Sequence, residues 1–149
     1  MSRVQLALRV SDLEGSIAFY RSLFGVEPAK RRPGYANFAV SEPPLKLVLI
    51  EGEPGRATVL DHLGVEVEET AAVDAATERL SALGLSTHVE DDVTCCYARQ
   101  DKVWVHGPGD EPWEVYTVTD DSPGYGRDGS VMPMTDPDGA TPARCCTGR

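Results

Sequence analysis

The sequence predicts an α+β protein of two tandem βαβββ modules whose strands form one cup-shaped mixed β-sheet, followed by a flexible C-terminal tail. Three observations predict this fold. Each half of the chain begins with an alternating apolar segment, continues with helical periodicity and returns to strand-like segments. The second half repeats the order of the first. Residues 120–149 lack apolar periodicity and are rich in Pro, Gly and Asp.

The first module is expected over about residues 1–52. Residues 4–10 alternate between two faces and place Gln5 on the face away from the helix that follows. Asp12 is suited to cap that helix, and Gly25 to end it in a left-handed conformation. Further strands are expected at YANFAV and LKLVLIE, with one more short strand near residues 29–32.

The second module is expected over about residues 60–119, so that one folded domain covers residues 1–119. DHLGVEV alternates as a strand, Thr70 is suited to cap a helix, and Gly84 to end it. Four strands are then expected, at STHVE, CCYARQ, KVWVHG and WEVYTV.

Aligning the two modules pairs their first and last strands. The alignment sets Gln5 opposite His62 and Lys46 opposite Glu114. Identity between the modules is low, but the order of elements agrees. The chain is therefore interpreted as an internal duplication.

Charge and cysteine usage limit the possible partners. A net charge of −10 and a pI near 4.6 disfavour nucleic acid and anionic membrane surfaces. No secretory signal or membrane-spanning run is recognised, so a cytoplasmic protein is expected. We expect free thiols, a small-molecule partner, and a monomer or homodimer.

The duplicated cup resembles the vicinal oxygen chelate superfamily over roughly residues 1–118. In that superfamily the metal ligands lie on the first and last strands of each module. The resemblance implies that the equivalent positions here are Gln5, Lys46, His62 and Glu114. By alternation, each of these four side chains faces the inside of the cup.

The chemistry of these four residues predicts three ligands. Gln5 offers a carbonyl oxygen, His62 an imidazole nitrogen and Glu114 a carboxylate, whereas the cation of Lys46 cannot bind a metal without losing its proton. Three ligands leave about half of an octahedral shell open, which suits Fe(II) with dioxygen and a substrate. Mn(II), Co(II) or Zn(II) fit the same donors.

His88 and His106 do not lie at duplicated positions of the two modules and are interpreted as surface residues.

Cys95 and Cys96 are adjacent, which makes a structural disulfide between them unfavourable. Two neighbouring thiolates suit one large thiophilic centre, such as trivalent arsenic, antimony, mercury or cadmium. Neighbouring side chains of a regular strand point to opposite faces, so joint binding requires a loop or bulge, which Thr94 could begin. The alternative is one buried and one exposed structural cysteine.

A more specific resemblance is carried by PPLKLVLIEG, LDHLGVEVE, CCYARQDKVWVHGPGDEPWEVY and the opening VQLALRV. With these stretches the chain resembles the organoarsenical carbon–arsenic lyases, grouped with cadmium-induced proteins. The resemblance implies that Cys95 and Cys96 hold the arsenic of a trivalent methyl or aromatic arsenical. It also implies that Gln5, His62 and Glu114 hold Fe(II), which activates dioxygen to cleave the carbon–arsenic bond and release arsenite.

Two other functions stay open from the sequence. One is a non-catalytic cadmium or metalloid binder that uses Cys95, Cys96 and the terminal Cys145 and Cys146. The other is a glyoxalase-like lyase or a drug-sequestering relative. Lys46 argues against the four-ligand glyoxalase site, and the cysteine pair has no evident role in drug sequestration. Cys145 and Cys146 are expected to be inert or auxiliary.

Overall fold

The structure is a computed structural model and describes residues 1–124. Its elements are, in chain order, β1 (Arg3–Val10), α1 (Leu13–Phe24), β2 (Lys30–Arg32), β3 (Tyr35–Val40), β4 (Leu45–Glu51), β5 (Val59–Glu66), α2 (Thr70–Ala82), β6 (His88–Cys95), β7 (Ala98–His106) and β8 (Pro112–Asp121). The last strand therefore continues to Asp121. The tail expected over 120–149 lies almost wholly outside the described residues.

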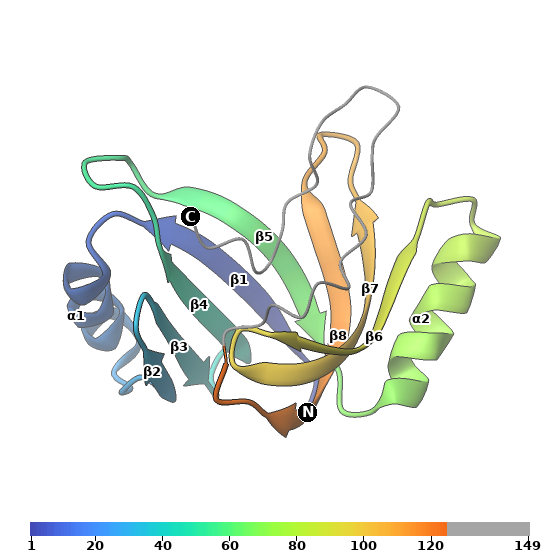
Figure 1. The fold of residues 1–149 in the computed structure, drawn as a ribbon, viewed down its shortest axis with the longest axis horizontal. Helices are drawn as coiled ribbons and strands as arrows, with labels where there is room; N and C mark the ends of the chain where they lie inside the picture. Colours follow the sequence, from blue (N-terminus) through green and yellow to red (C-terminus); the bar gives the residue numbers. More distant parts are fainter. Residues whose placement is uncertain (125–149) are drawn as a thin grey trace.

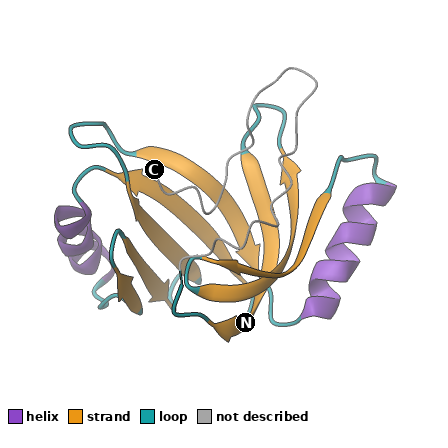
Figure 2. Cartoon of the chain, in the orientation of Figure 1, coloured by secondary structure: helices purple, strands orange, loops and turns teal. Residues whose placement is uncertain are grey.

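All eight strands form one sheet in the order β2-β3-β4-β1-β5-β8-β7-β6. β1 pairs with β4 in parallel and with β5 antiparallel, while β5 pairs with β8 in parallel. Each module therefore contributes four strands, and the two first strands meet at the centre of the sheet. The sheet curls into a half-barrel with α1 and α2 at its two ends (Figures 1 and 2). The predicted α+β cup of two modules is confirmed.

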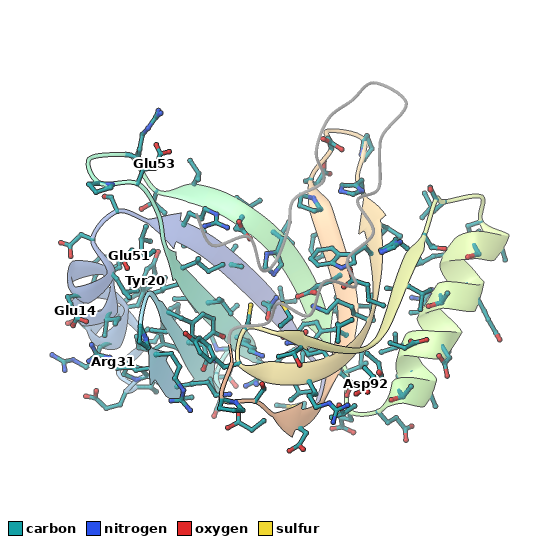
Figure 3. The ribbon with its side chains drawn as sticks, viewed as in Figure 1. Glu14, Tyr20, Arg31, Glu51, Glu53 and Asp92 are labelled. Atoms are coloured by element: carbon teal, nitrogen blue, oxygen red, sulfur yellow. The ribbon has the colours of Figure 1, made fainter. Side chains whose placement is uncertain are left out.

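The first helix begins and ends where the sequence predicts. Asp12 Oδ1 accepts a hydrogen bond from Gly15 N at 2.9 Å, and Gly25 ends α1 with a φ of 67°. On its outer side, Glu14 forms an ion pair with Arg31 of β2 at this end of the molecule (Figure 3). Neither helix within residues 1–124 is long and apolar enough to cross a membrane.

The second helix differs from the prediction at its start. Its N-cap is Glu69, whose side chain makes no capping hydrogen bond, so the Thr70 cap is wrong. Thr70 Oγ1 instead donates to Asp101 Oδ2 of β7 at 2.5 Å, because a partner on the sheet competes for the hydroxyl. At the other end, Gly84 follows the helix with a φ of 83°.

The second module has three strands after its helix, not four. Cys96 and Tyr97 have φ values of 52° and 62°, and Cys95 pairs with Ala98. Two consecutive positive φ values make a two-residue hairpin turn of the type that matches strand twist. The turn lies inside CCYARQ. Cys95 ends β6, Cys96 and Tyr97 form the turn, and the strand that begins at Ala98 runs without a break into KVWVHG.

The core divides between the two faces of the sheet. α1 packs on one cluster and α2 on another, and both lie on the outer face. The concave face carries its own cluster of buried side chains, formed by Ala7, Tyr35, Val48, Ile50, Cys95, Cys96, Tyr97 and Trp104. Both cysteines therefore lie inside the cup.

Candidate functional site

The strand register gathers the three predicted ligands. Gln5 on β1 is opposite Gly64 on β5, and Gly64 is opposite Glu114 on β8. His62 precedes Gly64 by two residues and therefore points to the same face. The three side chains, called the triad below, meet at the centre of the sheet on its concave side.

The triad is compact and buried. The Gln5 amide nitrogen Nε2 lies 3.0 Å from His62 Nε2 and 2.7 Å from Glu114 Oε1, and His62 Nε2 lies 3.3 Å from Glu114 Oε1. All three residues are at most 4% exposed. Polar groups this deeply buried require partners, and here they are each other's partners.

Gly64 makes this approach possible. A Cβ atom added at Gly64 would lie 3.1 Å from Glu114 Cγ and 3.2 Å from Gln5 Nε2. Any larger residue would therefore push the side chains of the two flanking strands apart. Sequence reasoning missed this position, because nothing in LGVEV distinguishes a spacing glycine from another strand residue.

His62 is oriented by a second layer of contacts. Its Nδ1 lies 2.7 Å from Asp61 Oδ2, and Arg9 Nε donates to Asp61 Oδ1 at 2.8 Å. Because a carboxylate only accepts, Nδ1 carries a proton, and Nε2 faces the triad. A carboxylate behind an imidazole is the usual support of a metal-binding histidine.

Glu114 has a second partner that sequence reasoning missed. Lys102 Nζ donates to Glu114 Oε2 at 2.7 Å, and the lysine is fully buried. Burial would raise the pKa of Glu114, but Lys102 and His62 more than offset burial and hold that pKa well below its ordinary value. One carboxylate oxygen thus binds the lysine, while the other faces the triad.

A second polar row runs beside the triad. Arg3, Glu66, Tyr116 and Lys102 are paired in this order across β1, β5, β8 and β7. Tyr116 OH lies 2.5 Å from Gln5 Oε1 and 2.8 Å from Glu66 Oε2. Burial, followed by the charges of Glu66 and Glu114, raises the pKa of Tyr116, so its hydroxyl stays protonated. Strand alternation from the ligands would have found three members of this row, because Arg3 and Tyr116 lie two residues from Gln5 and Glu114 and Glu66 lies four residues after His62.

Lys46 lies opposite Gln5 in the strand register, but its side chain contacts the second row and not the triad. Its Nζ lies 2.9 Å from Glu66 Oε2 and 5.1 Å from the centre of the Tyr116 ring. The position aligned with Glu114 thus carries a cation that is paired with a carboxylate.

Glu66 makes the metal-free protein sensitive to acid. Burial raises its pKa, but Lys46, Tyr116 and Arg3 more than offset burial and hold the pKa below the ordinary value of 4.5. The folded state then binds fewer protons than the unfolded chain, so the free energy of unfolding is expected to fall from about pH 5 to pH 3. Urea unfolding should show a smaller fall for Glu66→Gln. An equal fall in both proteins would contradict this role of Glu66.

The cysteine pair satisfies the geometric condition for joint binding. Cys95 ends β6 and Cys96 opens the hairpin turn, which brings the two Sγ atoms to 3.4 Å. Both are buried, at 3% and 8% exposure. The predicted departure from regular strand geometry is confirmed, although it is a hairpin turn after Cys95 that provides it.

Contacts with the first module hold the hairpin tip across the cup. Lys30 Nζ donates to the carbonyl of Tyr97 at 3.0 Å, and Tyr97 OH donates to the carbonyl of Pro33 at 3.3 Å. The rings of Tyr35 and Tyr97 are 5.4 Å apart. The cysteine turn is therefore held by residues from both modules.

The thiols and the triad share one surface. Trp104 belongs to the same concave cluster as both cysteines, and its ring centre lies 5.5 Å from that of His62. Gln100 Nε2 donates to the carbonyl of Cys95 at 3.0 Å. Among buried side-chain polar atoms in the described part of the chain, Gln100 Oε1 lacks a hydrogen-bond partner.

Known proteins share the sequence pattern and the fold of this chain. Residues 3–141 match the model of the glyoxalase/bleomycin resistance protein/dioxygenase superfamily. The chain belongs to this superfamily. A protein of Thermomonospora curvata named "Trivalent organoarsenical cleaving enzyme" is 60% identical over 149 residues, covering all of this chain and 91% of that protein. "Cadmium-induced protein CadI" of Mycobacterium tuberculosis is 55% identical, covering all of this chain and 95% of the other.

A solved structure of the superfamily shares the fold. The Mn(II)-bound glyoxalase from Novosphingobium aromaticivorans superposes with a TM-score of 0.58 at 22% identity, covering 86% of this chain and 43% of that one. The predicted resemblance to the glyoxalase/dioxygenase superfamily is thus confirmed.

The remaining candidate residues lie apart from the triad. His88 and His106 are both partly buried, and His88 Nε2 lies 3.6 Å from Glu90 Oε1. Cys145 and Cys146 lie outside the described residues. Within residues 1–124, no three His, Cys, Asp or Glu side chains form a metal-binding group. In this member of the superfamily, a three-donor set at the triad therefore requires the amide of Gln5.

Proposed function

We propose that this protein is an Fe(II)-dependent dioxygenase that cleaves the carbon–arsenic bond of trivalent organoarsenicals and releases arsenite. The observation that supports it best is the joint presence of a close thiol pair and the triad on one concave surface. The 60% identity to a protein named as a trivalent organoarsenical cleaving enzyme supports the same substrate class. Methyl and aromatic arsenicals are both proposed as substrates.

Cys95 and Cys96 are proposed to hold the arsenic. Each thiol would displace one hydroxyl of a trivalent arsenical as water, which leaves the carbon substituent on arsenic as its third ligand. The 3.4 Å between the sulfur atoms allows one arsenic to bind both. Fixing the arsenic in this way also fixes its carbon substituent inside the cup, which replaces a bimolecular encounter by a positioned one.

Gln5, His62 and Glu114 are proposed to hold the metal. The three side chains converge on one point, but the Gln5 amide presents its nitrogen there, 3.0 Å from His62 Nε2 and 2.7 Å from Glu114 Oε1, so the amide would turn over to bind an ion through its oxygen. Imidazole nitrogen with carboxylate and amide oxygen suits Fe(II). When bound, Fe(II) would supply the activation of dioxygen. Asp61 would keep the His62 lone pair directed at the ion.

The walls of the cup complete the proposed site. Tyr35, Val48, Ile50 and Trp104 surround the thiols with apolar surface that fits a methyl or aryl group. Gln100 Oε1 is a buried acceptor near the cysteine turn for a polar group of the substrate. These residues would position the substituent and exclude water.

The proposal is tested by turnover. Anaerobically purified protein loaded with Fe(II) should release arsenite from a trivalent methylarsenical, with many equivalents per protein when oxygen and a thiol reductant are supplied. Arsenite is separated from the methylarsenical by chromatography and quantified. The metal-free protein and an oxygen-free reaction are the controls and should release none. Release of no more than one equivalent would refute catalysis.

A second candidate function is sequestration of cadmium or a metalloid, which the 55% identity to a cadmium-induced protein favours. The same two thiols would then bind a soft ion without turnover. Stoichiometric retention of cadmium or of intact arsenical, without arsenite, is its expected result. A glyoxalase-like isomerase is disfavoured because Lys46 contacts Glu66 and supplies no fourth donor.

A further inference from the structure

The Tyr116 hydroxyl has one proton and two neighbours that can only accept it. It lies 2.5 Å from Gln5 Oε1 and 2.8 Å from Glu66 Oε2. A phenol donates a single hydrogen bond, so one of these two close contacts is without a proton. Both Tyr116 and Gln5 are buried, at 0% and 4% exposure, which makes an unmet contact costly.

The other end of the Gln5 amide faces the triad. Its Nε2 donates to Glu114 Oε1 at 2.7 Å and lies 3.0 Å from His62 Nε2. The NH2 group thus supplies positive charge where the triad would hold a cation. Turning the amide over would place an oxygen 2.7 Å from a carboxylate oxygen, which is repulsive unless a cation binds both.

Turning the amide over also gives a proton to both close contacts of the Tyr116 hydroxyl. Nε2 would then donate to the tyrosine oxygen, and the single phenol proton would go to Glu66 Oε2. Lys46 and Arg3 keep Glu66 in place through contacts of 2.9 and 2.8 Å. Both contacts of the Tyr116 oxygen then have a proton, and Gln5 Oε1 faces the triad.

We propose that Tyr116 is a positioning residue that, with Glu66 behind it, holds the Gln5 amide with its oxygen toward the metal. The inference rests on the proposed function, because it takes Gln5 as a metal ligand. The amide can take two orientations, and only the one with its oxygen toward the triad supplies a metal donor.

Removing the phenol hydroxyl tests this role. Tyr116→Phe should weaken Mn(II) binding by about 10-fold or more, the usual effect of losing a group that orients a ligand. Affinity is measured by calorimetric titration of variants that circular dichroism shows to be folded. The matched control is Tyr20→Phe, which removes the hydroxyl of a partly buried tyrosine that packs against the outer-face cluster and lies outside the cup. Its Mn(II) affinity should equal that of the unmodified protein.

A variant at Gln5 separates orientation from general damage. Gln5→Glu has oxygen at both ends and needs no orientation, so adding Tyr116→Phe to it should leave Mn(II) affinity unchanged within about 2-fold. An equal loss from Tyr116→Phe with and without the Gln5→Glu change would overturn the inference, as would an unchanged affinity in Tyr116→Phe alone. If Gln5→Ala itself leaves Mn(II) affinity unchanged, Gln5 is no ligand, and the ligand assignment in the proposed function fails instead.

Discussion

Replacing Cys95 or Cys96 by serine is expected to lower arsenite release by about 100-fold or more, because an unanchored arsenical loses its position in the cup. Metal affinity should be unchanged, since neither sulfur belongs to the triad. The isosteric change keeps the buried volume, and the hairpin is held independently by Lys30 and by the ring contact with Tyr35. Turnover of a trivalent methylarsenical and Mn(II) affinity are measured on the same preparations.

The control for this experiment is a Cys145→Ser/Cys146→Ser double variant. The terminal pair lies outside the described residues and is proposed to be inert or auxiliary, so this variant should retain turnover. Unreduced turnover in Cys96→Ser, or none in the terminal double variant, would reverse the roles given to the two pairs. Loss of metal from Cys95→Ser would show that the sulfur atoms serve the metal site.

The sequence predicts the fold from periodicity, whereas the triad also needs the resemblance to the superfamily. Alternation sets Gln5, His62 and Glu114 on the face away from the helices, and the duplicated order of elements makes their strands equivalent. That the first and last strands of each module carry the ligands is what the resemblance implies. The structure places the three side chains within 3.3 Å of each other.

The partners of the triad could not be predicted in the same way. Lys102 reaches Glu114, and Tyr116 reaches Gln5, only because β8 is aligned with β7 and β5 in one particular register. Alternation gives the face of a residue but not its neighbour on the next strand. The sequence indicates a loop or bulge at the cysteines but not a hairpin turn, because Cys96 and Tyr97 adopt positive φ without the Gly or Asn that signals such a turn.

Glu114→Ala is expected to remove the metal and also to destabilise the protein by about 3–5 kcal/mol, the usual cost of leaving a buried charge without its partner. The partner is Lys102, which is fully buried and donates to Glu114 Oε2 at 2.7 Å. His62→Ala should remove the metal as well. Its cost in stability should be smaller, because its partner Asp61 keeps the hydrogen bond from Arg9.

A second substitution separates the two roles of Glu114. Glu114→Ala/Lys102→Met replaces the buried ammonium by an apolar chain of similar length, so most of the lost stability should return while metal affinity stays lost. Urea unfolding of the metal-free proteins gives the free energies, and calorimetric titration gives the affinity for Mn(II). A Glu114→Ala protein as stable as the unmodified one would show that Lys102 does not depend on this carboxylate. Mn(II) affinity that survives in Glu114→Ala would remove Glu114 from the ligand set.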